Sequence, residues 1–299
     1  MIDLSRLPAP HVVEPLDFED LFRAKKDRLL AAVPEQIRAA VAETVAMESE
    51  PLTILLQEAA YGELVLRQRV NDAARATMLA YATGSDLDNR AADYGVTRQV
   101  VTPADPDAHP PVEAVMESDD RLRYRCQMAF EGLSVAGPSG AYVFHALSAS
   151  PEVDDVAVLS PSPGVVRVIV LPTTDARSVP DLLDAVAAYL SDDSRRPLTD
   201  CVQVDEAARV EFEIEARLHM YPGPSPIPVI EAARMALDRY LSESRKIGYD
   251  VTMSGIYAAL HQPGVQRVEL ASPAGNIVID EASSALCTRI TLDVGGVDV

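Results

Sequence analysis

Apolar residues in the first hundred positions recur with the spacing of helices. They fall on one broad face between Asp17 and Val33, and after Pro34 a second amphipathic helix is predicted over Glu35–Met47. The longest pattern starts at Pro51 and continues for about thirty residues without an internal proline. Its apolar positions follow steps of three and four: Leu52, Leu55, Leu56, Ala59, Leu66, Val70, Ala73, Thr77 and Ala80. Such a helix is about 45 Å long and usually packs along a neighbour in its own chain or in another subunit.

Glycines and prolines mark where these helices are expected to end. Gly84 is predicted to end the long helix, and Ser85-x-x-Asp88 resembles a capping box that opens a short helix, which Gly95 closes. The segment 102–112 carries four prolines, and we expect it to form neither helix nor sheet ladder. A linker is therefore predicted at 101–118.

Beyond the linker, helices and strands are expected to alternate. The predicted helices cover 119–131, the residues after a Ser139 cap, 179–190, 228–243 and 253–261. The predicted strands cover 153–159 and 165–171, joined as a hairpin, then 202–220, and finally 265–271, 276–280 and 286–294.

An internal repeat suggests how these elements are grouped. Ser139-Gly-Ala-Tyr142, followed by Pro151 and then by Ser160-Pro161, corresponds to Ser254-Gly-Ile-Tyr257, Pro263 and Ser272-Pro273. We interpret it as a duplicated unit of helix, helix, strand, strand. The predicted fold is therefore α+β: a long helical region at 1–100, the linker, and duplicated modules at 119–200 and 201–299.

The charge and the cysteines exclude several classes of protein. A formal net charge of −20 and a pI near 4.6 argue against a surface for nucleic acid or anionic lipid, since both need clustered Lys and Arg. No apolar run is long enough to span a bilayer. The N-terminal residues Met1–Arg6 show no apolar region of a secretory signal, so none is expected. Cys126, Cys201 and Cys287 are too far apart for a metal motif, so we expect three reduced, buried thiols in a cytosolic protein.

The residue types that perform chemistry do not fall into a convincing constellation. Gly137-Pro-Ser139-Gly140-Ala141 approaches a nucleophile elbow, but a predicted helix precedes it and Ser254 repeats the position without an elbow. The five histidines include no pair at metal-binding helical spacing. Acidic side chains at 211, 213 and 215 share one face of a strand, which is either solvated or docks a basic partner. We predict no catalytic, cofactor or metal site.

One block of the chain resembles a known family. The run from Ala82 to Arg98 is similar to the baseplate J-like family of contractile phage tails. It carries the family's glycine, a Leu-Asp pair, a small helix and Gly-x-x-Arg, here the structural residues Gly84, Leu87, Asp88, Gly95 and Arg98. The helix opening at 117–125 and Ser139-Gly140 continue the likeness, which covers about 50–295. Many members insert a β-rich segment where this chain has its linker.

The resemblance implies an architectural role rather than an activity. Members form baseplate wedges around a central hub, and two copies commonly join one smaller tail protein through long N-terminal helices. Carried over, 51–83 is the helix for the wedge core, with Leu52, Leu56, Leu66 and Val70 as candidate contact residues. The expected partners are sibling wedge proteins, further copies of this chain, the hub and the sheath. The expected location is the tail baseplate of a virion assembled in the bacterial cytoplasm.

Three other hypotheses stay open on the sequence. The same part could belong to a headless contractile injection device or tailocin, in which case no capsid or terminase genes would neighbour it. A hydrolase would use Ser139 or an acidic pair. An acidic adaptor would bind a basic partner through Glu211, Glu213 and Glu215.

Overall fold

A computed structural model describes the chain except residues 1–3, 5–6, 9, 135, 224 and 298–299. The chain divides into two compact units. The helical unit contains Met1–Arg98 and Ser118–Gln127, and the sheet unit contains Gln99–Glu117 and Met128–Val299. Each unit is described by itself below. Within the described residues no helix is both long and apolar enough to cross a bilayer.

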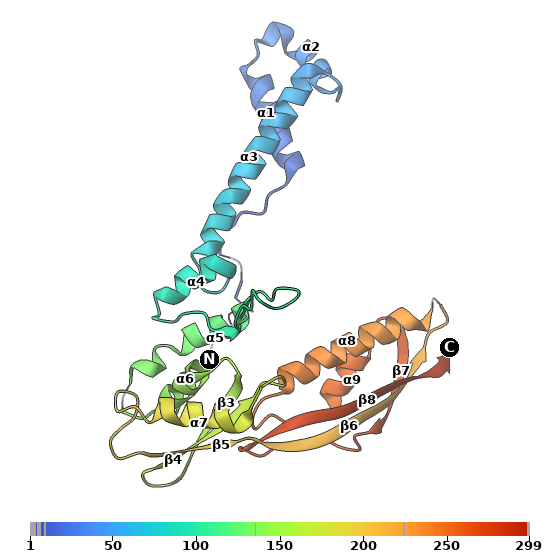
Figure 1. The fold of residues 1–299 in the computed structure, drawn as a ribbon. Coiled ribbons are helices and arrows are strands. Elements are labelled where there is room, and N and C mark those ends of the chain that lie inside the picture. The colour runs from blue at the N-terminus through green and yellow to red at the C-terminus, as the bar shows by residue number, and fades with distance from the viewer. Residues whose placement is uncertain (1–3, 5–6, 9, 135, 224, 298–299) are drawn as a thin grey trace. The chain divides into compact units, whose positions relative to one another are not determined.

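The helical unit confirms the predicted order of helices. Its elements are α1 (Phe18–Ala32), α2 (Glu35–Val45), α3 (Pro51–Ala76), α4 (Gly84–Ala92) and the greater part of α5 (Asp119–Met128). Asp17 caps α1, because its carboxylate accepts the Asp20 N–H at 3.0 Å. Pro51 occupies the first turn of α3, where the missing N–H costs nothing. The helices α1 and α3 pack along one another (Figure 1).

The predicted end of α3 and the predicted start of α4 need correction. The helix α3 ends at Ala76, seven residues before the predicted end at Thr83, and the Thr77 hydroxyl donates back to the Ala74 carbonyl at 2.8 Å. Gly84 does have a left-handed φ of 54°, but it begins α4. Ser85 is not a cap, because Thr83 holds that position without a side-chain hydrogen bond. The predicted end of α4 is confirmed: Gly95 has φ 68° and its N–H donates to Ala92 O.

The predicted linker contains a small antiparallel ladder. Strands β1 (Val100–Thr102) and β2 (Val115–Met116) pair, and Asp105 bridges to Val112 further along the ribbon. The expectation of no sheet ladder was therefore wrong. The prolines lie outside both strands, in the loop that joins them, where they remove no hydrogen bond from the ladder.

The first sheet of the sheet unit has the order β3-β4-β5. Strands β3 (Val153–Ser162) and β4 (Val165–Pro172) form the predicted hairpin, with Gly164 in the turn at φ 78°. Strand β5 (Cys201–Glu206) runs parallel to β4 after the helix α7 (Val179–Leu190). The short helix η2 (Glu131–Leu133) and α6 (Ser139–Ala149) come before the sheet. The buried core joins α6, α7 and the strands: Tyr142, Ala146, Leu147, Val153, Val156, Val168, Val170, Leu182, Val186 and Leu190.

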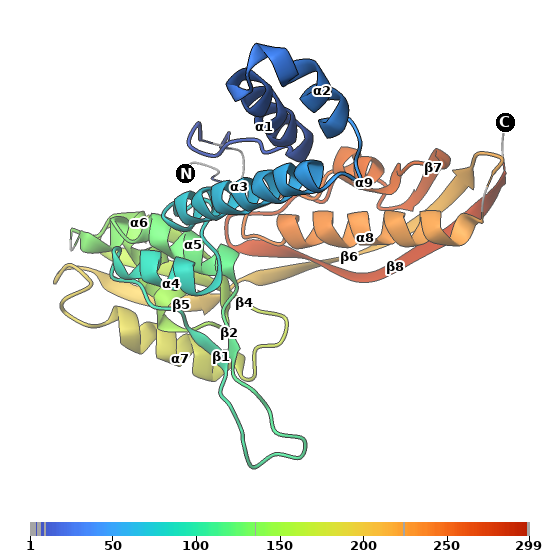
Figure 2. The ribbon, with the colours of Figure 1, turned by 90° about the horizontal axis from the view of Figure 1, so that it is seen from above.

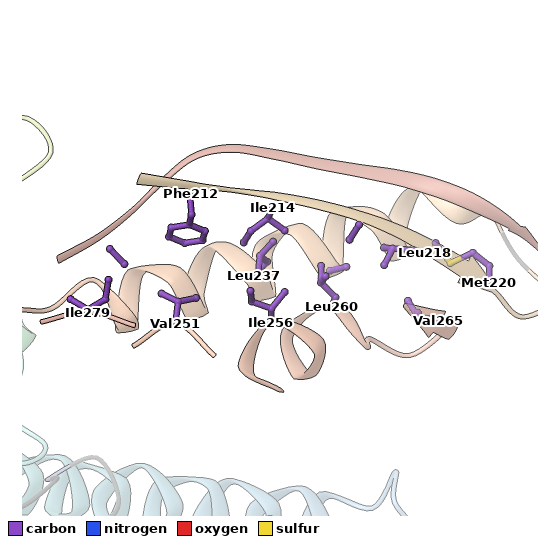
Figure 3. Packing of buried hydrophobic residues seen from close by; sticks show 13 residues of the cluster. Phe212, Ile214, Leu218, Met220, Leu237, Val251, Ile256, Leu260, Val265 and Ile279 are labelled. Carbon is purple, nitrogen blue, oxygen red and sulfur yellow. The ribbon is translucent and has the colours of Figure 1, made fainter. Parts of the chain in front are cut away.

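The second sheet has the order β7-β6-β8 and is covered on one side by two helices. Its elements are β6 (Ala208–Met220), α8 (Pro226–Ser244), α9 (Met253–Leu260), β7 (Val265–Ser272) and β8 (Ser283–Val297). The alternation predicted for β6 is confirmed, since Phe212, Ile214 and Leu218 are buried against the helices while Glu211, Glu213 and Glu215 are not. Figure 3 shows Leu237 of α8 and Ile256 of α9 facing these strand residues.

The α+β class is confirmed, but two details of the predicted modules were wrong. The single strand expected over 202–220 is interrupted at buried Ala207, so β5 joins the first sheet and β6 the second. A boundary between 200 and 201 therefore separates β5 from its sheet. The segment 276–280 is no strand and forms only the bridge from Ile277 to Val251. Strands β7 and β8 lie on either side of β6 and each pairs with it.

The cysteines are free thiols, as expected, but they are not all buried. Cys126 is buried and Cys287 is partly buried, whereas Cys201 at the start of β5 is exposed. Cys201 is exposed because it begins an edge strand, where alternate positions face solvent.

Candidate assembly surfaces

One side of α3 is covered by the chain itself. Thr53, Ala60 and Asn71 are its buried positions and share one side of the helix. Asn71 is bonded in both directions to the segment before α1: its amide oxygen accepts the Glu14 N–H at 3.0 Å, and its amide nitrogen donates to Glu14 O at 2.9 Å. These two bonds hold the N-terminal segment along α3.

Ion pairs support the same packing. Glu63 lies between Lys25 and Arg67, with Arg67 Nη2 2.7 Å from its carboxylate, and Arg67 also reaches Glu14 at 3.1 Å. The hydrogen bond from Lys25, together with that from Arg67, holds the pKa of Glu63 below its usual value. Glu63 therefore faces α1, although the three- and four-residue pattern alone would place it among the apolar contact positions.

The opposite side of α3 is apolar and uncovered. Six large side chains there are between 48% and 66% exposed: Ile54, Leu55, Tyr61, Val65, Leu66 and Val70. At about 100° per residue these positions share one half of the helix surface, away from Thr53, Ala60 and Asn71. We call these six residues the open face of α3. The exposed residues Glu58 and Arg69 lie on the same half of the helix, so charged side chains are interspersed among the apolar ones. Several large apolar side chains exposed on one side of a helix are typical of a binding site for another protein.

The predicted contact residues fall partly on this face. Leu66 and Val70 belong to it, whereas Leu52 and Leu56 are half-buried at its border with the α1 side. The prediction missed Ile54, Tyr61 and Val65, which lie off the chosen stripe. A count of apolar residues around the whole helix could have found them, because one neighbour covers only one side.

Arg98 holds α4 and α5 together within the helical unit. Its guanidinium donates to Asp88 at 2.6 Å, to Asp119 at 2.7 Å and to the Gly84 carbonyl at 3.3 Å. Asp119 also accepts the Gly84 N–H at 3.1 Å and so takes the place of the missing side-chain cap of α4. These four residues form what we call the Arg98 clamp. Three of them, Gly84, Asp88 and Arg98, were predicted as structural motif residues. Asp119 was not among these, although it lies in the segment 117–125 that resembles the family's helix opening.

The pKa shifts in the clamp follow from its bonds. Burial of the guanidinium opposes its charge, but the bonds that it donates to Asp88 and Asp119 outweigh this and raise the pKa of Arg98. Burial likewise opposes the charge of Asp119, and the Gly84 N–H and Arg98 outweigh it, so the pKa of Asp119 is lowered. Both groups are therefore held in their charged forms.

The rest of the predicted motif has equally local roles. Leu87 is fully buried, and Arg123 on α5 donates to the carbonyls of Leu79 and Ala82 at 2.8 Å each. These bonds tie the turn between α3 and α4 to α5. Arg123 lies in the segment that resembles the family's helix opening, so the signal for it was present in the sequence.

The structure does not bring Ser139 to a catalytic partner. Ser139 is the first residue of α6, and the cap position belongs to Pro138, so the predicted Ser139 cap was wrong. In the second copy Thr252 is the cap of α9, and its hydroxyl accepts the Gly255 N–H at 3.2 Å. A Cβ at Gly140 would lie 2.8 Å from Glu131 Oε2, so a larger residue there would displace the Glu131 side chain.

Neither the histidines nor the acidic strand forms a ligand site. In the part of the chain that the structure describes, no three His, Cys, Asp or Glu side chains gather in a way that could hold a metal ion. Arg289 of β8 pairs with two glutamates of β6, with Glu213 at 2.6 Å and with Glu215 at 3.4 Å. This neutralises part of the acidic face that the adaptor hypothesis would need.

Comparisons with known proteins account for the whole chain. Three family models match it: the Baseplate J-like N-terminal domain over residues 48–105, the Baseplate J-like central domain over 134–206, and the Baseplate J-like protein C-terminal domain over 212–293. The second and third models meet around the break at Ala207. The chain is 49% identical to "Baseplate protein J" of Escherichia phage P2 over 299 residues, which is 100% of this chain and 99% of that protein. It is also similar to a chain of the cryo-EM structure of the anti-feeding prophage baseplate, with 17% identity, a TM-score of 0.43, and coverage of 59% of this chain and 43% of that chain.

Proposed function

The chain belongs to the baseplate J-like family, and we propose that within a contractile-tail baseplate it is a wedge protein that joins its neighbours through the open face of α3. Its baseplate role is structural. The observation that carries this is the 49% identity to baseplate protein J of phage P2 along the full length of both chains.

The open face of α3 supports the proposed role in the wedge. Burying one large apolar side chain is worth about 1.5–3 kcal/mol, and six such residues lie on one side of a single helix. Nothing in the described part of the helical unit covers these side chains, while helices from other subunits could bury them. We propose that the helices packed here come from a smaller sibling tail protein and from a second copy of this chain.

The remaining partners follow from the same proposal. Wedges that surround a hub must also contact the hub, the sheath and each other, and the sheet unit offers the larger surface for those contacts. A structural part needs no catalytic centre, and we propose that the protein has none. It would function in the tail baseplate of a virion assembled in the host cytoplasm.

The test compares assembly of two surface variants. Leu66→Glu places a charge on the open face of α3, and Met235→Glu places the same charge on an equally exposed position of α8. We expect both chains to fold. Tail particles assembled with Leu66→Glu should lack the protein, whereas those with Met235→Glu should contain it in normal amount, as measured by quantitative mass spectrometry of purified particles.

Two outcomes would contradict the proposal. Normal incorporation of Leu66→Glu would show that the open face of α3 is not the assembly surface. Wild-type particles that lack the protein altogether would reject a baseplate role. Pull-down from cells that express single tail proteins would then identify which sibling binds the wild type and not Leu66→Glu.

A further inference from the structure

Strand β8 is a long edge strand with one uncovered side. It covers Ser283–Val297 and pairs only with β6 in the second sheet (Figures 1 and 2). On its other side, within the described residues, a single bridge joins Ser284 to Ile247 near its start. The later part of the strand therefore presents backbone N–H and C=O groups that no other strand pairs, which is the usual template for strand addition. One carbonyl on this edge, that of Ile290, accepts a long hydrogen bond of 3.5 Å from the Arg234 side chain of α8. The same guanidinium donates to Asp238 at the shorter distance of 3.1 Å.

The sequence of this part is chemically symmetric about Thr291. Residues 288–294 are Thr-Arg-Ile-Thr-Leu-Asp-Val. If the strand is read in both directions from Thr291, apolar Ile290 matches apolar Leu292 and basic Arg289 matches acidic Asp293. The outer members, Thr288 and Val294, are both β-branched. An antiparallel partner with the same sequence would therefore meet a complementary residue at each position.

The two faces of the strand fit the same register. Ile290 and Leu292 pack against the apolar cluster under α8 and α9, so the strand's apolar positions lie on the helix side. Asp293 lies on the opposite face and is exposed, and within the described residues it makes no hydrogen bond or ion pair. Val294 is 46% exposed on the helix side. Arg217 of β6 is the register partner of Asp293, but no ion pair joins the two side chains. A partner strand beside β8 would cover Val294 and bring a second cation, Arg289 of the other copy, close to Asp293.

We propose that β8 pairs with β8 of a second copy of this chain, antiparallel and centred on Thr291. Two ion pairs form across the twofold axis, each between Arg289 of one copy and Asp293 of the other. Within its own chain Arg289 also pairs with Glu213 and Glu215, so the new pair adds a third carboxylate to a guanidinium that is 60% exposed. The two sheets become one continuous sheet, and the pairing closes on itself because both copies use the same strand. The pairing needs no other tail protein, so it is tested separately from the proposed wedge function. The strand pairing can be absent while the protein still joins the wedge, and it can be present when the protein does not.

The first experiment measures association of the full chain by analytical ultracentrifugation. Every variant carries Leu66→Glu, which removes association through α3, and the buffer has physiological ionic strength because each chain carries a net charge of −20. This background chain should form dimers whose fraction rises with concentration. Adding Asp293→Arg should weaken dimerisation by about tenfold or more, since two attractive pairs become repulsive. Adding Glu211→Arg makes the same charge change on the central strand and should have no effect.

A mixture then separates direct pairing from a general effect of charge. Arg289→Asp alone should also fail to dimerise, but mixed with Asp293→Arg it should form a heterodimer, because each acidic position then faces a basic one. A background chain that stays monomeric at all concentrations overturns the proposal. So does an equal loss of dimer with Glu211→Arg.

Disulfide trapping tests the register and does not depend on Arg289. Thr291→Cys places two thiols on the twofold axis, where paired Cα atoms of an antiparallel ladder are about 4.5–5.5 Å apart, within disulfide range. Val294→Cys moves the thiol three residues off the axis and serves as the control. We expect a covalent dimer from Thr291→Cys, above the background of the native cysteines, and none from Val294→Cys. Trapping of both to the same extent would reject this register.

Discussion

Removal of the Arg98 guanidinium should loosen α4 and α5 without disturbing the sheet unit. The Arg98 side chain is 11% exposed, while its partners Asp88 and Asp119 are 47% and 32% exposed. Two charge-assisted bonds would be worth up to about 1.5–3 kcal/mol each if fully buried. Exposure of the two carboxylates reduces this toward the values of surface pairs. We therefore expect Arg98→Ala to cost about 2–3 kcal/mol of local stability.

Hydrogen exchange of the full chain, followed by mass spectrometry, measures this cost directly. A loss of 2–3 kcal/mol corresponds to exchange roughly 30- to 150-fold faster for amides of α4 and α5 that open together. Peptides of β6 and α8 should exchange as in the wild type. Arg98→Lys keeps the charge but not the fork of donors, so its exchange should lie between the two. Unchanged exchange of α4 in Arg98→Ala would refute the clamp, and wild-type exchange in Arg98→Lys would refute the role of the fork.

The clamp also predicts the sign of a pH effect. The pKa of Asp119 is lower in the folded chain than in the unfolded one. Its contribution to stability is therefore present above the unfolded pKa of about 3.9 and is lost as the pH falls through the folded value. The difference in exchange between wild type and Arg98→Ala, corrected for the intrinsic rate, should shrink below about pH 4. A difference that grows on acidification would contradict this.

The other predictions concern packing and one buried acid. Leu87→Ala removes a fully buried side chain and should cost about 2–4 kcal/mol in urea unfolding of the helical unit; a loss under 1 kcal/mol would contradict it. Gly255→Ala places a methyl 2.3 Å from the ring of Tyr240, so its free energy of unfolding should fall by about 1–3 kcal/mol, measured by urea unfolding. Gly62→Ala meets no atom within 4 Å, and its free energy of unfolding should rise by up to about 1 kcal/mol. Burial raises the pKa of Asp155, so its ionisation weakens the folded state as the pH rises from the unfolded value through the folded one. The melting temperature of Asp155→Asn relative to wild type should therefore increase as the pH rises above about 4, and a decrease would reject this.

Local signals in the sequence predicted the elements well. The alternation in β6 and the helical spacing in α3 are each encoded within a few neighbouring residues, because side chains repeat every two or about 3.6 positions. Gly95 ended α4 as expected, since its left-handed conformation depends on the adjoining turn alone. The same local rules failed at Ser85 and Ser139, where a polar residue near a helix start was taken for the cap. The first N–H of α4, that of Gly84, is accepted by the carboxylate of Asp119, which lies thirty-five positions further along the chain.

The sequence by itself therefore determined where helices and strands form, the α+β class and, through its family motif, the structural role. Only the tertiary structure decided how those elements share partners. Periodicity predicts that α3 has an apolar side, but the position of α1 decides which of its residues stay exposed. Leu66 is therefore exposed, whereas Leu56 is half-buried. Likewise, the run 202–220 is one extended segment in its local pattern, and the break at Ala207 arises because each half hydrogen-bonds to a different sheet. Such pairings are contacts between residues distant in the chain, and their energies do not appear in any local window of sequence.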